Sequence, residues 1–322
     1  MQLAAHHPDG SEIISGSLSC QACGLSVPVV DGVARFDSHG YAHNFSAQWK
    51  RFTDFAKYYA VDDETYYRKG LGLVPADVSG KKVLEVGCGN GRAVRHFLQG
   101  RPELFVALDL SEAIDVVQKE FRNAPNLLPI ECDLRRMALK PRSFDIVFTY
   151  GVLHHTPDAA AAFQSVAKFV APGGTLAIWV YNPKNRPGTI SDWVQRNSHR
   201  IPRALLLVFC WFSALLGYGF YLWSKIPGLR VLHRPALKTA QQGFRILESK
   251  HFMQHLLWAH DFHTTRYTSY HTPDEVKGWF KAAGFEDMVN LRGSGMSGRK
   301  ARIPAVDVET AAAVGGWPSA QV

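Results

Sequence analysis

Residues 82–92, KVLEVGCGNGR, decide the fold class of this 322-residue chain. The first half is a short apolar run typical of a buried strand, and the second half places Gly87, Gly89 and Gly91 ahead of a predicted helix. Glycine lets backbone N–H groups approach a ligand where a Cβ atom would collide. A nicotinamide-binding fingerprint would carry Gly or Ala at the sixth position of GxGxxG, where this chain has Arg92. The stretch therefore predicts a strand, a ligand-binding loop and a helix, and it disfavours hydride transfer.

Short apolar runs alternate with helical segments from residue 81 to residue 182, on both sides of this loop. Such alternation is typical of βαβ units, and it predicts an α/β fold with a doubly wound, seven-stranded, mostly parallel sheet of Rossmann-like type. The predicted strands are Lys82–Val86, Leu104–Asp109, Leu127–Glu131, 144–149, 175–181, 286–293 and 297–302.

Capping residues and prolines predict the helix boundaries. Ser111 is the predicted N-cap of the helix after the second strand, and Pro157 is the predicted first residue of the helix after the fourth. The glycine pair at 173–174 would end that second helix. Thr272 and Glu275 form a capping box that opens the last helix.

Acidic side chains end two neighbouring predicted strands. Asp109 closes the second strand, where a carboxylate of a doubly wound sheet can accept hydrogen bonds from both ribose hydroxyls of a nucleotide ligand. Asp133 follows the third strand, where a second carboxylate could accept a hydrogen bond from an adenine amino group. The alternative is that each acid caps the turn that follows it.

Five motifs of this region resemble one family when they are taken together. VLEVGCGNGR, ALDLS, CDL, FDIVFTYGVLHHTPD and APGGTLAIWVYN are similar to those of class I S-adenosylmethionine-dependent methyltransferases, in the branch that includes quinone-biosynthesis and many small-molecule enzymes. The motifs occur in family order, and the resemblance spans residues 80–182 and resumes at 261–302. It implies S-adenosylmethionine as the cofactor. It also implies that Gly87, Gly89 and Gly91 shape the pocket for the methionyl part, with Glu85 orienting the loop.

The same resemblance implies contacts with the rest of the cofactor. Asp109 would hold the ribose, and Leu110 would pack on the adenine. Asp133 and Leu134 would read the adenine edge. Tyr150, at the end of the fourth strand, would offer its carbonyl to the cofactor's amino group.

Histidines at the end of the fourth strand are candidates for a catalytic base. Methyl transfer from a sulfonium is an in-line displacement, so the protein supplies alignment and a dry site, and a base where the acceptor carries a proton. A neutral imidazole of His154 or His155 could deprotonate a hydroxyl or a carbon acid. Alternatively, either ring caps the next helix or packs in the sheet. His155 matches the family position better.

Residues 259–276, AHDFHTTRYTSYHTPDEV, resemble an acceptor-side stretch of one subgroup of these enzymes. Asp261, Phe262, Arg266 and Tyr267 fit its pattern, and an acid, an arginine and a tyrosine on one loop could orient a polar head group. A surface loop whose aromatic residues cover the sheet edge is the alternative. The predicted catalytic residues are His155, Asp261 and Tyr267.

Two sequence features invite a metal interpretation. His251 and His255 lie one helical turn apart, but the Glu of a hydrolytic HExxH motif is absent. Cys20 and Cys23 form a CxxC that resembles the second half of a zinc ribbon, whereas a structural zinc needs four ligands, for which His6 and His7 would have to substitute. We predict no bound metal, and we interpret residues 1–40 as a degenerate zinc-ribbon-like β appendage.

Residues 204–223, ALLLVFCWFSALLGYGFYLW, carry no charge and have basic flanks at Arg200, Arg203, Lys225 and Arg230. Their length suffices to cross a bilayer. However, motifs of one sheet lie on both sides of the run, and a spanning helix would separate them. A surface helix or hairpin in one leaflet and a lid over an apolar substrate channel both fit, and an ordinary core helix is the alternative.

These features divide the chain into an appendage at 1–40, a helical lead-in covering the cofactor cleft at 41–80, a methyltransferase domain at 81–302 and a loose tail at 303–322. The domain contains an apolar helical insertion at 183–260, in which we interpret the basic segments beside the apolar run as loops. The 36 Lys and Arg exceed the 28 Asp and Glu, so the net charge of +8 favours anionic surroundings. Five cysteines and a start without a secretion signal favour the cytoplasm.

The predicted function is S-adenosylmethionine-dependent methylation of an oxygen or carbon of a small, hydrophobic acceptor, with peripheral membrane contact through 204–223. An RNA methyltransferase is an alternative that the basic charge favours. Against it, the fourth strand ends in TYGVLHH rather than in an Asn/Asp-Pro-Pro-aromatic motif, so we expect no nucleic-acid partner. A noncatalytic, membrane-associated protein that retains the cofactor fold is a third hypothesis.

Overall fold

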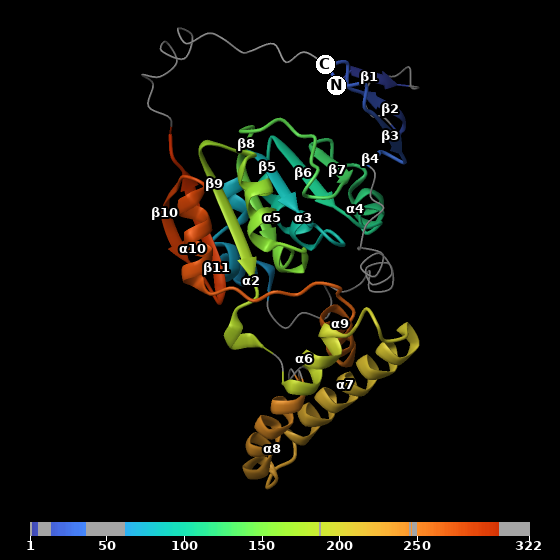
Figure 1. The fold of residues 1–322 in the computed structure, drawn as a ribbon, viewed down its shortest axis with the longest axis vertical. Helices are drawn as coiled ribbons and strands as arrows, with labels where there is room; N and C mark the ends of the chain where they lie inside the picture. Colours follow the sequence, from blue (N-terminus) through green and yellow to red (C-terminus); the bar gives the residue numbers. More distant parts are fainter. Residues whose placement is uncertain are drawn as a thin grey trace.

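A computed structural model describes residues 2–5, 14–36, 62–186, 188–244, 246 and 250–302. One twisted sheet of eleven strands runs through the described residues, in the order β1-β2-β3-β4-β7-β6-β5-β8-β9-β11-β10 (Figure 1). The strands are β1 (Gln2–Ala5), β2 (Ser15–Ser19), β3 (Ser26–Val30), β4 (Val33–Arg35), β5 (Lys82–Val86), β6 (Leu104–Asp109), β7 (Leu127–Glu131), β8 (Phe144–Tyr150), β9 (Val170–Val180), β10 (Phe285–Asn290) and β11 (Ser294–Lys300).

Strands β7, β6, β5, β8 and β9 pair in parallel and form the doubly wound part of the sheet. Their residues alternate between two apolar clusters, one on each face, as strands covered on both sides require. Val83 and Phe105 belong to one cluster, and Leu84 and Val106 to the other. The alternation of side chains therefore assigns a helical layer to each face.

The helices that cover the sheet lie on both of its faces (Figure 1). On one face pack α2 (Asp63–Leu71), α3 (Arg92–Phe97) and α4 (Ile114–Phe121), through residues such as Leu71, Phe97 and Val117. On the other face pack α5 (Ala159–Ala167) and α10 (Pro273–Ala282), through Phe163 and Phe280. Short 3₁₀ turns complete the chain path at Pro75–Val78, Leu98–Gly100, Leu153–His155 and Pro183–Asn185.

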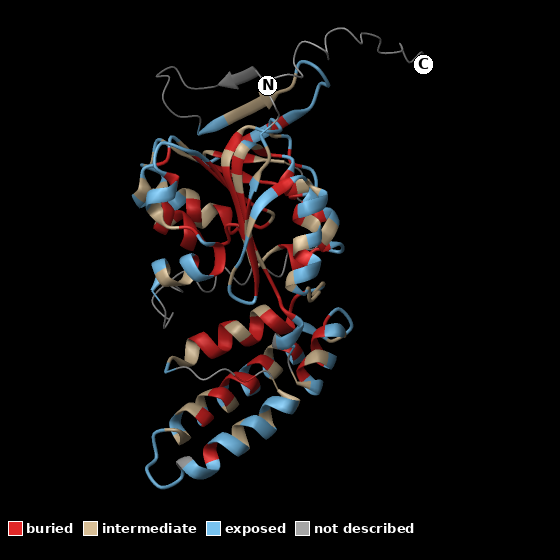
Figure 2. Cartoon of the chain, turned by 90° about the vertical axis from the view of Figure 1, so that its left-hand side faces the viewer, coloured by how far each residue is buried: buried red, intermediate tan, exposed pale blue. Residues whose placement is uncertain are grey.

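Four helices between β9 and α10 form a separate layer beyond the end of β9 (Figure 1). They are α6 (Thr189–Arg196), α7 (Arg203–Trp223), α8 (Arg230–Gly243) and α9 (Phe252–His263). α7 packs against α9 through Cys210 and Ala214 on one side and Leu256, Leu257 and Ala259 on the other. Figure 2 shows buried residues concentrated along the central sheet and many exposed residues on the outer helices of this layer.

The prediction of seven strands was wrong for the sheet as a whole. Seven strands come from residues 82–300, but β1 to β4 extend the same sheet because β4 pairs in parallel with β7, through Ala34 with Ile130 and Arg35 with Glu131. Since β1 to β4 pair with one another antiparallel, as do β9, β11 and β10, five of the ten strand pairings are parallel. The sheet is mixed rather than mostly parallel.

Three predicted helix boundaries also differ. The Ser111 hydroxyl accepts a hydrogen bond from Ala113 N but itself donates to Asp109, and α4 begins only at Ile114. α5 begins at Ala159 rather than at Pro157, because Asp158 is its N-cap and accepts a hydrogen bond from Ala161 N at 3.0 Å. The glycine pair at 173–174 lies inside β9 rather than at a helix end.

Other parts of the sequence interpretation fall partly outside the described residues. Of the lead-in at 41–80 the structure describes 62–80, which hold α2 and a 3₁₀ turn, and the tail at 303–322 is not described. The basic segments on either side of the apolar run were interpreted as loops, but they form α6 and α8. Thr272 caps α10 as expected, since its Oγ1 accepts a hydrogen bond from Glu275 N, whereas the Glu275 carboxylate of the predicted capping box pairs with His271.

Candidate functional site

A pocket of about 730 Å³, its mouth included, lies at the carboxyl ends of the parallel strands. Nine of the twelve predicted site residues line it. They are Gly87, Gly89, Asp109, Leu110, Asp133, Leu134, Tyr150, His155 and Asp261. Glu85, Gly91 and Tyr267 are not among its lining residues.

The glycine loop needs its glycines for two different reasons. At Gly87, φ is 81° and a Cβ atom would lie 2.3 Å from Cγ2 of Val152, which also lines the pocket. At Gly91, φ is 80° and the residue is the N-cap of α3, where a Cβ atom would meet Val117 Cγ2 at 3.0 Å. Gly87 therefore brings the loop close to the pocket wall, whereas Gly91 turns the chain into the helix.

Asp109 ties the loop to the neighbouring strand. Its Oδ2 accepts a hydrogen bond from Gly89 N at 2.8 Å, and its Oδ1 accepts from Ser111 N at 2.8 Å and from Ser111 Oγ at 2.6 Å. Burial raises the pKa of Asp109, the hydrogen bonds from Ser111 and Gly89 act in the opposite direction, and the carboxylate of Glu131 raises it further. The side chain both caps a turn and lines the pocket, so the two interpretations of this acid coexist.

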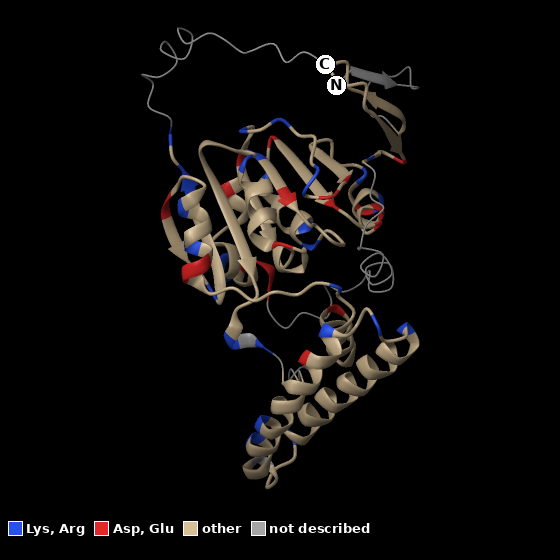
Figure 3. Ribbon diagram, in the orientation of Figure 1, with Lys and Arg blue, Asp and Glu red and all other residues tan. Residues whose placement is uncertain are grey.

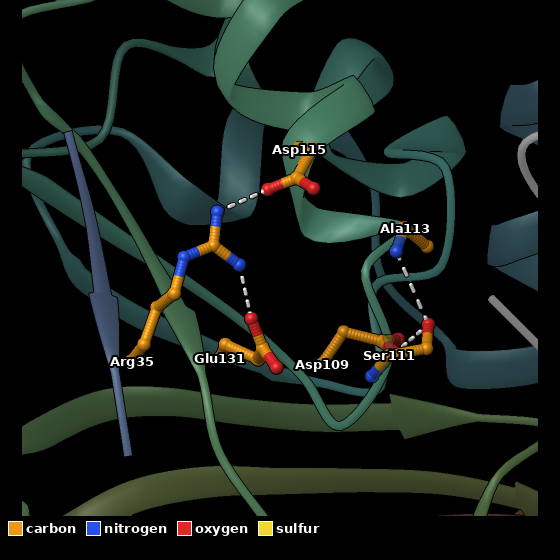
Figure 4. Close-up of polar contacts among 6 residues, drawn as sticks. All are labelled: Arg35, Asp109, Ser111, Ala113, Asp115 and Glu131. Carbon is orange, nitrogen blue, oxygen red and sulfur yellow. Dashed lines mark hydrogen bonds and ion pairs between the residues drawn. The ribbon is translucent and has the colours of Figure 1, made fainter. Parts of the chain in front are cut away.

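Figure 4 shows how Arg35 of the N-terminal appendage contacts two acidic residues near Asp109. Arg35 of β4 donates from one end of its guanidinium to Glu131 and from the other to Asp115 Oδ1 at 2.6 Å. Glu131 is 6% exposed and pairs in register with Asp109 on the adjacent strand. Arg35 therefore neutralises a buried carboxylate that lies beside the pocket.

Asp133 has an arginine partner of its own. Its Oδ1 accepts from Arg135 N at 2.9 Å, and its carboxylate forms an ion pair with the Arg135 guanidinium at 2.5 Å. Burial would raise the pKa of Asp133, but the hydrogen bonds and charge of Arg135 outweigh it and hold the pKa below its usual value. The group lines the pocket as an ionised carboxylate.

Glu85 lies beneath the glycine loop rather than in the pocket wall. Its side chain is 4% exposed, and within the described residues no hydrogen-bond partner reaches its Oε2. Burial, with a smaller contribution from the charge of Asp109, raises the pKa of Glu85 to about 8. At neutral pH the carboxyl is largely protonated and carries a hydrogen-bond donor next to the loop.

Tyr150 reaches the pocket, and its ring packs among other aromatic side chains. The ring stacks on Trp179 at a centroid distance of 4.9 Å with an interplanar angle of 6°, and it meets Tyr66 of α2 at 4.7 Å. α2 approaches so closely that a Cβ atom at Gly70 would lie 2.4 Å from the ring. This packing fixes the end of β8, where the pocket begins.

His155 lies in the 3₁₀ turn after β8 and is 6% exposed. Its Nδ1 lies 3.0 Å from the carbonyl oxygen of Tyr267, and a carbonyl only accepts. In a neutral imidazole the proton therefore resides on Nδ1 and the lone pair on Nε2. Tyr267 orients His155 through its main chain, and a catalytic role for its side chain stays a prediction. The neighbouring His154 is fully buried, with its ring 3.8 Å from that of Tyr181.

The residues of the acceptor-side stretch 259–276 lie in three different places: the pocket, the interior and the surface. Asp261, near the end of α9, lines the pocket, so the helical layer contributes directly to the site. Phe262 is 1% exposed and packs in the interior, and Arg266 is exposed with its guanidinium 5.3 Å from the Tyr267 ring.

Sequence reasoning missed the residues that complete the wall. They neighbour predicted residues along the chain, and all but one are apolar or glycine: Val86, Leu108, Cys132, Gly151, Val152 and Thr156. Their position next to the ends of β5 to β8 was the available signal.

The histidine and cysteine features form no metal site within the described ranges, where no group of three or more His, Cys, Asp or Glu is placed to hold an ion. Cys20 and Cys23 lie at the turn between β2 and β3, where Cys20 N donates to Leu25 O at 2.8 Å. His6 and His7 lie outside the described residues. His255 packs inside the helical layer, and His263 binds Ser191 Oγ through Nε2 at 3.0 Å.

Comparison with known proteins gives a family match over part of the sheet, from β5 to β9. Residues 84–178 match the family described as "Methyltransferase domain". The chain is 29% identical over 118 residues to phthiotriol/phenolphthiotriol dimycocerosates methyltransferase 1 of Mycobacterium ulcerans. The matched region covers 36% of this chain and 42% of that protein. It is 31% identical over 105 residues to the ubiquinone biosynthesis O-methyltransferase of Neisseria meningitidis, covering 31% and 44%. The chain thus spans less than half the length of these curated relatives.

The chain is also similar to the solved structure of an S-adenosylmethionine-dependent methyltransferase from Mesorhizobium loti, with 27% identity and a TM-score of 0.32. The similarity covers 34% of this chain and 53% of that protein. The family match, together with the two curated relatives, supports a methyltransferase domain over residues 84–178, with S-adenosylmethionine as its cofactor.

Proposed function

We propose that this chain transfers the methyl group of S-adenosylmethionine to an oxygen or carbon of a small, lipophilic acceptor, as enzymes of the quinone-biosynthesis branch do. One observation carries the proposal: the pocket brings the glycine loop and the two strand-end acids together with His155 and Asp261. The first group suits a nucleoside cofactor, and the second suits an acceptor with a proton to lose.

The residues present fit the cofactor. At Gly87 a Cβ atom would collide with Val152, so only glycine lets the loop take this position beside the proposed methionyl site. In the proposal Asp109 accepts hydrogen bonds from the ribose hydroxyls, and Asp133 accepts one from the adenine amino group. The apolar side chains of Leu110 and Leu134 would lie on either side of the adenine. Glu85 and Gly91 support the loop from outside the pocket.

When bound, the cofactor would supply a methyl group on a positively charged sulfur. The electron pair of the methyl–sulfur bond would stay with the sulfur, and a lone pair of the acceptor would form the new bond to the methyl carbon. In the proposal His155 removes the acceptor's proton through Nε2, while its Nδ1–H is held by the Tyr267 carbonyl. Asp261 orients the acceptor from the side of α9, which closes the site toward the helical layer. Removal of this proton makes the acceptor a better nucleophile.

Lipophilic character of the acceptor is supported by the apolar part of the pocket lining, which includes Val86, Leu108 and Val152. The resemblance to a ubiquinone biosynthesis O-methyltransferase supports oxygen as the methylated atom. Peripheral contact of residues 204–223 with a membrane belongs to the same proposal, because an apolar acceptor partitions into lipid.

Two measurements test the proposal. Calorimetric titration of the full chain with S-adenosylmethionine tests the cofactor site, and absence of binding would remove the basis of the proposal. Incubation with methyl-labelled S-adenosylmethionine and fractionated cell extract then tests the acceptor class. We expect label in the lipid-soluble fraction, in a compound one methyl heavier than its precursor, and label in RNA instead would show that the acceptor class is wrong.

A further inference from the structure

α7 has one face that packs inside the protein and one that faces solvent. The buried face presents Leu206, Cys210, Ala214 and Phe220, and the Cys210 thiol lies 3.5 Å from the Ala259 carbonyl of α9. The helix, 21 residues long, is also apolar and long enough to cross a membrane by length and composition. Its inner face is thus engaged with α9, and only its outer face is available to a partner.

The outer face is an unbroken apolar stripe. Its members are spaced by three, four or seven positions and so lie in one line along the helix. Each is about half exposed or more: Leu205 (59%), Val208 (65%), Phe212 (50%), Leu215 (58%) and Leu222 (49%). We call these five residues the α7 stripe.

Exposed apolar side chains continue past the end of the helix. The turn into α8 carries Ile226 and Leu229, and the first residues of α8 include Val231, which is 79% exposed, and Leu232. A contiguous apolar surface of this kind on a folded protein marks an interaction site.

The charged residues that surround this surface are all basic. Between residues 193 and 247 the chain has eight Lys or Arg and no Asp or Glu. Arg200 and Arg203 lie at the N-terminal end of α7, Lys225 at its C-terminal end, and Arg234 and Lys238 on α8, and these five side chains are exposed. Figure 3 shows no charged residue along α7 except at its N-terminal end, and it shows basic residues on the neighbouring α8.

Extending the membrane contact of the proposed function, on which this inference rests, we propose that the α7 stripe inserts into one leaflet of a membrane with anionic headgroups, with α7 lying in the plane of the interface. An apolar face with basic residues at its borders is the arrangement that binds acyl chains and lipid phosphates together. A second copy of the chain is disfavoured as the occupant, because a twofold contact would place the same basic residues against one another.

A spanning orientation is disfavoured by the packing of α7. α9 runs along its inner face, and α9 carries His255, His260 and Asp261. A spanning α7 would draw these polar groups into hydrocarbon. Asp261 instead lines the pocket, so α9 joins the membrane-facing helix to the site at which a lipophilic acceptor would bind.

Vesicle flotation tests the proposal and does not depend on methyl transfer. Full-length protein is mixed with phosphatidylcholine vesicles that either contain or lack phosphatidylglycerol. We expect flotation with the anionic vesicles and at least about a fivefold weaker partition without them, since each basic residue near an anionic surface contributes about that factor. The double variant Val208→Glu/Leu215→Glu should lose flotation. Its matched control is Val289→Glu on β10, which is 54% exposed and remote from α7.

A charge variant tests the headgroup contribution separately. Arg200→Gln/Arg203→Gln/Lys225→Gln should reduce binding to anionic vesicles by about fivefold per residue at low salt. Lys119→Gln/Lys140→Gln/Lys281→Gln removes the same charge from exposed positions elsewhere and should bind like the wild type. Circular dichroism and thermal unfolding confirm that each variant folds.

Three outcomes would overturn the proposal. They are absence of flotation with either vesicle, wild-type flotation of the stripe variant, and a wild-type dimer in sedimentation that the stripe variant abolishes. The last result would assign the stripe to a second copy of the chain.

Discussion

Glu131 and Asp109 pair in register on the adjacent parallel strands β7 and β6, with Asp109 lining the pocket. The charge of Glu131 raises the pKa of Asp109 and so disfavours the ionised form that accepts hydrogen bonds from a ribose. Arg35 binds Glu131 and so reduces this repulsion. The β appendage is thereby connected through charge to the pocket proposed for the cofactor.

Arg35→Gln should weaken binding of S-adenosylmethionine by about 1 kcal/mol, or about fivefold, because it leaves Glu131 buried and uncompensated beside Asp109. Calorimetric titration measures the effect. Arg68→Gln breaks an exposed ion pair with Glu64 on α2 and serves as the control, with unchanged affinity expected. Equal affinity in the Arg35 variant and the wild type would show that the appendage does not act on the site.

Asp109→Asn should weaken cofactor binding by about 1 to 3 kcal/mol, since an amide offers one acceptor atom in place of two and leaves Gly89 N or a ribose hydroxyl without a partner. Asp115→Asn is the matched control. It removes the other partner of Arg35 without touching the pocket, and we expect a much smaller change. If the two variants bind the cofactor alike, the proposed ribose contact of Asp109 is wrong.

Glu85→Gln should change how stability depends on pH. Because the folded-state pKa of Glu85 is about 8 rather than 4.5, the stabilising contribution of its proton is complete below the lower value and is lost as pH rises through the higher one. Glutamine does not titrate, so the variant should gain about 2 kcal/mol or more in unfolding free energy relative to the wild type between about pH 5 and about pH 8. Denaturant unfolding at a series of pH values measures this gain.

Glu64→Gln, at an exposed position of α2, is the control for that series and should run parallel to the wild type. Parallel curves for Glu85→Gln as well would mean that the Glu85 carboxyl keeps an ordinary pKa.

His155→Asn should lower turnover on the identified acceptor by about 100-fold while cofactor affinity stays unchanged, because general-base catalysis contributes on that order. Tyr267→Phe keeps the main-chain carbonyl that orients the ring and should retain near wild-type turnover. A large loss in Tyr267→Phe would instead establish a catalytic role for its hydroxyl. Normal turnover of the His155 variant would mean that alignment alone suffices.

The parallel core was predictable because its signals are local. The bounds of β5, β6 and β7 agree with the apolar runs that predicted them, and the glycine loop and strand-end acids follow from the same runs. β9 was predicted to begin five residues late, since its Ala-Pro-Gly-Gly segment has the composition of a turn but stays extended. α8, a helix of fourteen residues, was not predicted, because its charged residues and the internal Pro235 are more typical of a loop.

The contacts that complete the site depend on tertiary structure. Arg35 meets Asp115 and Glu131 across 80 and 96 positions of sequence, and the Tyr267 carbonyl meets His155 across 112. No periodicity encodes such pairs, since they arise from the strand order and the return of the chain through α9. The prediction of residue types at strand ends was possible, whereas their partners required the structure.

The pairing of β9 with β11 has a consequence during synthesis of the protein. Val180 and Ser294 are neighbours in the sheet, yet every residue of α6 to α10 is translated between them. At ribosomal rates of about 5 to 20 residues per second, this interval lasts roughly 6 to 23 s. During that time the edge of β9 that β11 will occupy has no partner strand. An unpaired strand edge can pair with another chain, so the risk of aggregation lasts until β11 is made and closes the edge.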